Sequence, residues 1–207
     1  MRLLGVLLLC ALVIPGAQVS AQSRNFIIRV PSVNLPAGVE IGRQPKRLVV
    51  TFRFGAQGQV EGCRATRSSG ISVIDATSCD LITRRFPPGR PGQEMRLDFE
   101  WYAVSPDPAQ VRVRPGDPLM ITSGGYISYT DYPSEANGRS GTVRYEMDVS
   151  AGGMPTGCRI LESSGVEVLD TTTCALAMER ARYLPSIDEA GNRRAATHQS
   201  LVRWQGN

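Results

Sequence analysis

Histidine, lysine and aromatic residues are all scarce in this sequence. His198 is the only histidine, Lys46 is the only lysine, and aromatic residues make up 6% of the chain. The positive charge is therefore carried almost entirely by arginines, which are scattered along the chain. Nucleic-acid-binding proteins usually combine a basic face with interleaved aromatic residues. We accordingly expect no nucleic acid among the partners of this protein.

Long hydrophobic runs are also absent beyond the N-terminus. Leu3 to Ile14 is an apolar run of about a dozen residues, short of the ~20 that a membrane-spanning helix needs. Arg2 precedes this run, and Val19-Ser20-Ala21 supplies the small residues of a cleavage site. Residues 1–21 are therefore predicted to be a signal peptide that is cleaved after Ala21, which places the mature protein in the periplasm. The alternative is an uncleaved segment that anchors the chain in the inner membrane.

What the sequence does contain is an internal repeat. The stretch from Gly62 to Leu81 reads GCRATRSSGISVIDATSCDL, and the stretch from Gly157 to Leu176 reads GCRILESSGVEVLDTTTCAL. Eleven of the twenty positions are identical at a constant offset of 95 residues, whereas ordinary residue usage would give roughly one match by chance. The chain therefore contains two copies of one small unit.

Each copy carries a pair of cysteines, Cys63 with Cys79 and Cys158 with Cys174. In an exported protein such pairs indicate disulfides, because the compartment beyond the membrane is oxidising. The alternatives are a four-cysteine zinc site, which usually contains closely spaced pairs, and a redox site, which usually contains C-x-x-C. Neither pattern is present. We predict one structural disulfide within each copy, worth roughly 3 kcal/mol.

The hydrophobic pattern changes in the same order in both copies. An alternating strand and a turn are followed by a second strand, a helix with apolar residues at three- and four-residue spacing, and a third alternating strand. In the first copy we expect strands at 50–54 and 95–101 and a helix over 73–85. In the second we expect strands at 143–149 and 197–204, with a helix between them that Pro185 ends.

These elements predict an α+β fold with two tandem domains. Each domain is expected to be a three-stranded antiparallel sheet packed with one main helix. The expected boundaries are a signal peptide at 1–21, domain one at 22–104, a Pro-containing linker at 105–126 and domain two at 127–207.

The second copy resembles a known family. Its landmarks are, in order, Tyr132-Pro133-x-x-Ala136, Gly141-x-Val143, Gly153, Ser163-Ser164-Gly165, Leu169-Asp170 and Tyr183-x-Pro185. This series is similar to the C-terminal domain of TonB, the periplasmic energy transducer of Gram-negative bacteria. The resemblance covers about 129–204. The first copy resembles the same domain over about 48–101 but lacks the Tyr-Pro-x-x-Ala opening, so it is a diverged copy.

The resemblance implies a binding function. TonB C-terminal domains bind a short segment, the TonB box, of outer-membrane receptors for siderophores, cobalamin and similar nutrients. The segment pairs with an exposed edge strand, which is β-augmentation. Carried over to this sequence, the edge is Met95 to Trp101 in the first copy. In the second copy the binding residues are Thr197, Gln199, Ser200, Val202 and Trp204. Because the first copy lacks the opening motif, we expect it to bind a peptide weakly or not at all.

The chain also departs from that family. A working transducer keeps an N-terminal transmembrane helix and a long Pro-rich spacer, and this sequence shows neither. We therefore expect a non-catalytic periplasmic TonB-like protein, linked to TonB-dependent transport but not an energy transducer by itself. Its partner would be a TonB-box-like segment of an outer-membrane receptor or of another envelope protein. The alternative is a structural envelope protein that self-associates, for instance as a homodimer, through the same edge strands.

Catalysis is not expected, and neither is a cofactor or a metal. Nucleophilic catalysis needs Ser or Cys beside a base, and a single histidine cannot serve both copies. Asp75 and Asp170 occupy equivalent positions at helix starts, which is typical of carboxylates that favour the helix dipole. His198 is expected to be an exposed surface residue. Trp101 and Trp204 are expected either to anchor their strands in the core or to contact a docked peptide.

Overall fold

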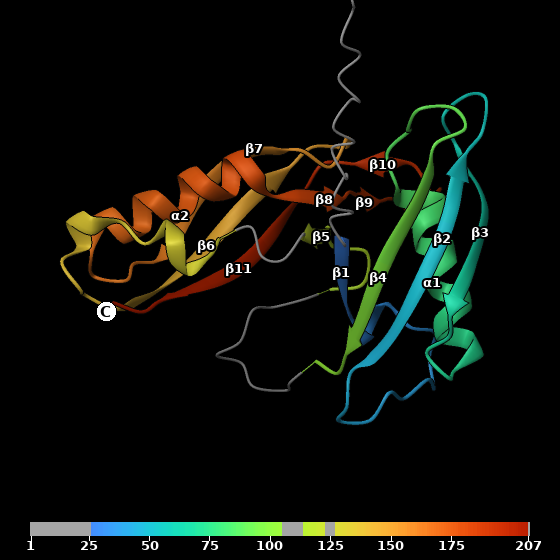
Figure 1. Ribbon diagram of the computed structural model, residues 1–207, viewed down its shortest axis with the longest axis horizontal. Coiled ribbons are helices and arrows are strands. Elements are labelled where there is room, and N and C mark those ends of the chain that lie inside the picture. The colour runs from blue at the N-terminus through green and yellow to red at the C-terminus, as the bar shows by residue number, and fades with distance from the viewer. Residues whose placement is uncertain (1–25, 105–113, 123–126, 207) are drawn as a thin grey trace, which may run out of the picture.

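The computed structural model describes residues 26–104, 114–122 and 127–206 (Figure 1). The described residues up to 122 form β1 (Phe26–Pro31), η1 (Ser32–Asn34), β2 (Lys46–Phe54), β3 (Val60–Arg67), α1 (Ser72–Arg85), β4 (Glu94–Tyr102) and β5 (Leu119–Thr122). The described residues from 127 onward form η2 (Tyr129–Asp131), η3 (Ser134–Ala136), β6 (Gly141–Val149), β7 (Pro155–Glu162), α2 (Glu167–Arg180), β8 (Arg182–Leu184), β9 (Ser186–Ile187), β10 (Arg193–Arg194) and β11 (Ala196–Trp204). The predicted signal peptide and residues 105–113 and 123–126 of the predicted linker lie outside the described residues.

Two strand–strand–helix–strand units are visible in Figure 1. Unit one contains β2, β3, α1 and β4, with the strands in the order β3-β2-β4, and unit two contains β6, β7, α2 and β11, with the strands in the order β7-β6-β11. All of these strand pairs are antiparallel. Each helix packs against the first two strands of its own unit. The mixed α+β architecture predicted from the hydrophobic pattern is therefore confirmed.

The element bounds repeat at the offset found in the sequence. β2, β3 and α1 begin and end 95 residues before β6, β7 and α2, respectively. In the third strand, Trp101 lies across from Lys46, the first residue of β2, and Trp204 lies across from Gly141, the first residue of β6. The two tryptophans are 103 rather than 95 residues apart. Unit two therefore has eight additional residues between its helix and its third strand, in the region that forms β8, β9 and β10.

The core of each unit lies between the helix and one face of the sheet. Side chains in a strand alternate between the two faces, so the apolar residues of β6 all point toward α2. They are at most 1% exposed: Val143, Tyr145, Met147 and Val149. Leu169 and Ala177 of α2 meet them and are fully buried. In unit one the corresponding strand, β2, buries Leu48, Val50, Phe52 and Phe54.

Each disulfide joins the second strand of its unit to the helix. Cys63 and Cys79 connect β3 to α1 with their Cα atoms 5.6 Å apart, and Cys158 and Cys174 connect β7 to α2 at 5.7 Å. Both pairings predicted from the sequence are thus present within the units. The bridge stabilises a strand–helix contact whose members are sixteen residues apart in the chain.

The sheet of unit one is larger than the predicted three strands. β1 pairs in parallel with β4, β5 pairs with β1, and β8 pairs with β5, which gives the order β3-β2-β4-β1-β5-β8. The prediction of a purely antiparallel three-stranded sheet is therefore wrong for this unit. Residues 119–122, which fall within the predicted linker, form a strand instead, because Leu119 and Ile121 pack against the core of unit one.

A buried arginine of α1 contributes to the junction between the units. Arg85 is 1% exposed, and its guanidinium donates to the carbonyl oxygens of Pro185 (2.7 Å), Asp117 (2.5 Å) and Leu184 (3.3 Å). Burial lowers the pKa of Arg85 to about 10, so the side chain is still a cation at neutral pH. The shared sheet and this cation together fix unit one against the segment that follows α2.

No helix among the described residues combines the length and the hydrophobicity that crossing a membrane requires.

Candidate strand-binding site

β11 forms an edge of the unit-two sheet. Its nine residues pair antiparallel with β6, from Ala196 opposite Val149 to Trp204 opposite Gly141. No strand among the described residues pairs with the other side of β11. In an antiparallel ladder, alternate residues direct their N–H and C=O groups toward opposite neighbours. Every second residue of β11 therefore presents these groups outward, where an added strand would find them.

The five residues predicted to form the site lie on the two faces of β11. Ser200 and Val202 lie on the face that α2 covers, because they pair with Tyr145 and Val143 of β6, whose side chains point toward α2. Trp204 lies on the same face, since it is two residues beyond Val202 and pairs with Gly141. Thr197 and Gln199 lie on the opposite face. An added strand would therefore place alternate side chains beside each of these two sets.

Trp204 is an anchor of the core. It is 5% exposed, its indole Nε1 donates to Thr173 Oγ1 at 2.8 Å, and the ring of Tyr132 lies 6.2 Å away in an edge-to-face arrangement. In unit one, Trp101 makes the same hydrogen bond to Ser78 at 2.8 Å. Of the two roles considered from the sequence, the anchoring role fits this geometry.

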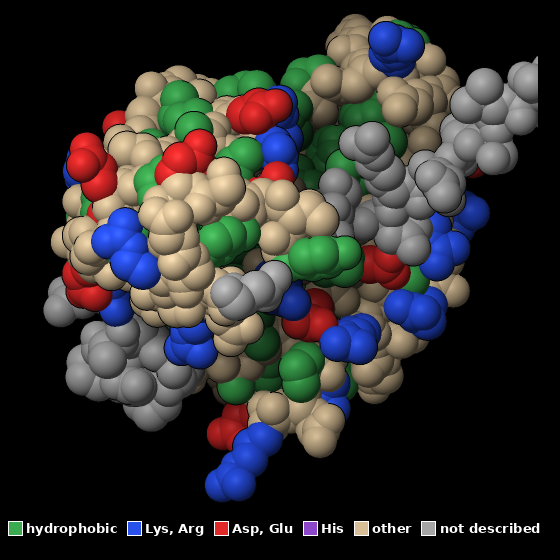
Figure 2. Space-filling model, turned by 60° about the vertical axis from the view of Figure 1, so that its left-hand side comes forward, with side chains coloured by type: hydrophobic (Ala, Val, Ile, Leu, Met, Phe, Trp, Pro, Cys, Tyr) green, Lys and Arg blue, Asp and Glu red, His purple; other side chains and the backbone are tan. Residues whose placement is uncertain are grey.

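The face of the sheet that points away from α2 is charged. Glu146 is 7% exposed because Arg159 forms an ion pair with it and Gln199 Nε2 donates to its Oε2 at 2.9 Å. Arg144 Nε lies 3.1 Å from Glu162 Oε1, and Arg203 of β11 is exposed. Figure 2 shows basic and acidic side chains interspersed with hydrophobic ones over the face that it presents.

The serines that precede α2 are used to fix the turn into the helix. Ser163 Oγ donates to Asp170 Oδ2 at 2.5 Å, and Ser164 donates to Asp170 Oδ1 from both its hydroxyl (2.7 Å) and its backbone N–H (2.9 Å). Burial raises the pKa of the Asp170 carboxyl, but these hydrogen bonds outweigh it, and the net shift is downward. Asp75 is held by Ser69 in the same way. Each carboxylate has a turn-fixing role, and its serines donate to it rather than to a general base.

His198 is not the exposed residue that the sequence predicted. Its Nδ1 lies 2.9 Å from the carbonyl oxygen of Pro118, and its ring centroid lies 5.1 Å from that of Tyr183. Burial lowers the pKa of His198, although the contact with the Pro118 carbonyl opposes this effect. The prediction failed because alternation places residue 198 on the side where β8 and the segment before β5 cover the sheet.

The equivalent edge in unit one is already occupied. Phe26–Pro31 pairs in parallel with Leu97–Tyr102 of β4, as Figure 1 shows for β1 beside β4. Ile28 and Val30 are fully buried there. The prediction of an exposed edge at Met95 to Trp101 is therefore wrong. The alternating pattern Phe26, Ile28, Val30 indicates a strand here, but the sequence does not show that it pairs with β4.

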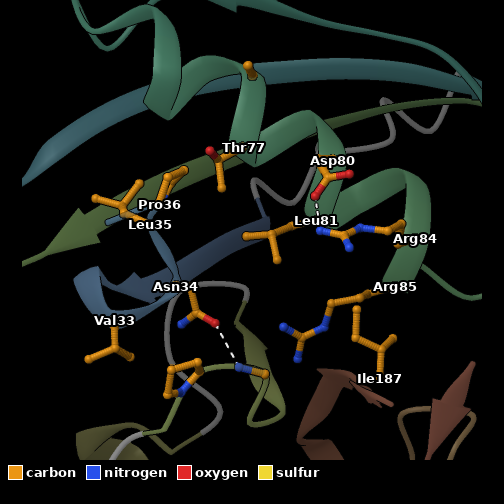
Figure 3. A pocket seen from close by; sticks show the side chains of 13 residues that line it. Val33, Asn34, Leu35, Pro36, Thr77, Asp80, Leu81, Arg84, Arg85 and Ile187 are labelled. Atoms are coloured by element: carbon orange, nitrogen blue, oxygen red, sulfur yellow. Dashed lines mark hydrogen bonds and ion pairs between the residues drawn. The ribbon is translucent and has the colours of Figure 1, made fainter. Parts of the chain in front are cut away.

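A pocket of about 530 Å³ lies beside α1, away from β11 (Figure 3). Its wall consists of residues of η1 and the turn after it, one face of α1, the 115–116 turn and Ile187. Its polar side chains already have partners, since Arg84 pairs with Asp80 and Asn34 Oδ1 accepts a hydrogen bond from the backbone N–H of Gly116 at 3.1 Å. Across residues 26–104, 114–122 and 127–206, no three His, Cys, Asp or Glu residues are grouped as metal ligands would be.

The geometry of unit two defines a small disulfide-bridged α+β domain whose third strand is an open sheet edge. The family model for the Gram-negative bacterial TonB protein C-terminal matches residues 128–205. These residues comprise η2, η3 and all of unit two, so the family resemblance of the second copy is confirmed. The family model does not match the first copy, whose similarity to unit two is in sequence repeat and strand order. No curated protein and no solved structure matches the sequence.

Proposed function

We propose that this chain is a non-catalytic periplasmic TonB-like protein whose unit two binds an extended segment of an envelope protein along β11. TonB C-terminal domains in general interact with outer-membrane receptors, so a receptor segment resembling a TonB box is the first candidate partner. The process served would be TonB-dependent transport across the outer membrane. The observation that carries the proposal is the contrast between the two units.

The contrast is between an occupied edge and an open one. Leu97 and Phe99 of β4, which has β1 as its neighbour in the sheet, are at most 1% exposed, whereas the equivalent Ser200 and Val202 of β11 are partly exposed. The main-chain groups that β1 satisfies on β4 have no strand partner on β11 among the described residues. Unit one thus provides, within the same chain, an example of how a strand completes this fold.

That example also supports an orientation for the partner. β1 runs parallel to β4, and the two third strands occupy equivalent places in their sheets. A segment added to β11 would accordingly run parallel to it, with alternate residues directed toward α2. Main-chain hydrogen bonds would supply most of the affinity, and the alternate side chains would add selectivity.

The proposal is tested by titrating the oxidised mature protein with a TonB-box peptide and following amide exchange across 196–204. We expect slower exchange in β11 and no change in β4. Two peptide derivatives sharpen the test, each N-methylated at one of the two alternate sets of residues. Only the set whose N–H groups face β11 should abolish binding. Equal loss from both sets, or binding without protection of β11, would contradict strand addition.

Self-association through β11 is the second candidate, because a nine-residue open edge is one that proteins usually cover. Light scattering distinguishes the two. A monomer that gains protection on adding peptide supports binding of a separate partner. A dimer in which β11 is already protected, and which ignores peptide, supports a structural envelope protein.

A further inference from the structure

The repeat allows β4 and β11 to be aligned residue by residue. Trp101 and Trp204 occupy the same position, since each pairs with the first residue of the equivalent strand and donates its indole N–H to an equivalent helix hydroxyl. Counting back from them, Phe99 corresponds to Val202, and Glu100 corresponds to Arg203. The contacts that β1 makes with β4 can therefore be transferred to a strand on β11.

The helix-facing contacts are similar in the two units. Ile28 lies across from Phe99, and Val30 lies across from Trp101, and all four are at most 1% exposed. A strand on β11 would place its corresponding residues across from Val202 and Trp204. These neighbours are again apolar, so β-branched or other apolar residues fit both positions.

The contact on the opposite face is reversed in charge. Between Ile28 and Val30, Arg29 lies across from Glu100, and its Nε is 3.4 Å from Glu100 Oε1. Arg47 also pairs with this glutamate, at 2.8 Å. In unit two the glutamate is replaced by the exposed Arg203, and Thr142 stands in the place of Arg47. A basic residue that suits β4 would therefore meet a like charge on β11.

From this reversal we infer that β11 selects an extended, parallel segment that carries Asp or Glu between two apolar residues, with the acidic side chain across from Arg203. The inference rests on the proposed function and specifies the partner's chemistry. Like charges directly across from one another destabilise a strand pair, whereas opposite charges stabilise it. The same arrangement disfavours exchange of the chain's own β1 into β11 of another molecule, because Arg29 would face Arg203. Such repulsion of a wrong partner is a common source of specificity.

The test uses a peptide of residues 25–33 and its Arg29→Glu variant, titrated into the oxidised mature protein at low ionic strength. We expect the Arg29→Glu peptide to bind about three- to tenfold more tightly, with slower amide exchange in β11. In the Arg203→Glu protein the order of the two peptides should invert. Arg90→Glu is the matched control, because it makes the same charge change at an exposed site in unit one. The preference should shrink in high salt, since both charges are exposed to solvent.

The outcomes separate this inference from the proposed function. Inversion by Arg203→Glu but not by Arg90→Glu supports selection by Arg203. Equal affinity of the two peptides, with protection of β11 in both cases, overturns the selection while leaving strand addition in place. If neither peptide protects β11 but a TonB-box peptide does, the pattern transferred from β1 is wrong. If no peptide protects β11, the proposed function and this inference fail together.

Discussion

His198 connects β11 to the segment before β5. Its ring packs on Tyr183 and its Nδ1 contacts the Pro118 carbonyl. Because burial holds the pKa of His198 below its ordinary value of 6.5, the folded protein takes up a proton at a lower pH than the unfolded chain does. The contribution to stability is thus complete above pH 6.5 and is lost as the pH falls through the lower folded pKa.

We therefore expect the free energy of unfolding to decrease as the pH is lowered from about 6.5. His198→Gln keeps a hydrogen-bond donor but does not titrate, so it should flatten this decrease. Urea unfolding at several pH values between 7.5 and 5 measures the slope. The assignment is clean because His198 is the only histidine. Asp75 and Asp170 affect stability only at lower pH, since the pKa of each carboxyl is lowered from its ordinary value of 3.8. An unchanged slope in the variant would exclude His198 as its source.

At the scale of elements, β1 completes unit one. It covers the edge of β4, and its inward side chains join the core while the outward ones lie beside the charged face. Ile28 is fully buried, whereas its neighbour Ile27 is only partly buried. The two isoleucines therefore form a matched pair for measuring what the buried side of β1 contributes.

Ile28→Ala should destabilise the protein by about 2–5 kcal/mol, because it leaves a cavity beneath β4 and removes buried apolar area. Ile27→Ala should cost clearly less. Urea unfolding gives both values, and amide exchange should show faster opening of Leu97–Tyr102 in Ile28→Ala alone. Equal effects of the two substitutions would mean that the inward face of β1 has no special part in covering β4.

Features that depend on local sequence could be predicted, whereas features that depend on distant strand pairing could not. The repeat and the alternating patterns predicted the disulfides, the third strand of each unit and the helix of unit one to within a residue or two, because each of these depends on local periodicity or spacing. The helix of unit two was predicted to continue to Pro185, which is wrong: α2 ends at Arg180, and Arg182–Leu184 form β8 instead, because they pair with β5. The residues of β1 could be read as a further strand of unit one, but its pairing with β4 could not be predicted, and β5 was missed, because both pairings join strands far apart in the chain. The surroundings of His198 were missed for the same reason. The sequence shows that Trp101 and Trp204 each lie at the end of an alternating strand. Their hydrogen bonds to Ser78 and Thr173 could not be predicted, because they depend on where each helix packs.

For the molecule as a whole, the last residue of each helix is an arginine, Arg85 in α1 and Arg180 in α2, and the two make different contacts. Arg180 of α2 binds Asp131 of η2 through both carboxylate oxygens at 2.9 Å, so it fastens the opening segment of its own unit. Arg85, at the equivalent position of α1, instead binds carbonyl oxygens of residues 117, 184 and 185. The first copy, which lacks the opening motif, thus uses its helix-end arginine to link the two units instead.

Arg85→Met should weaken that link, because a side chain of similar length fills the space but leaves three carbonyl oxygens without their donor. Unsatisfied buried groups cost about 1–3 kcal/mol each, so we expect a loss of several kcal/mol and unfolding in two steps, one for each unit. Arg84→Met is the control, since Arg84 is half exposed and pairs with Asp80 of its own helix. Small-angle scattering should report a broader distribution of dimensions for Arg85→Met only. If Arg85→Met unfolds in one step with the dimensions of Arg84→Met, the shared sheet through β5 and β8 is sufficient to hold the units together, and the proposed peptide site on β11 does not depend on the buried cation for its position.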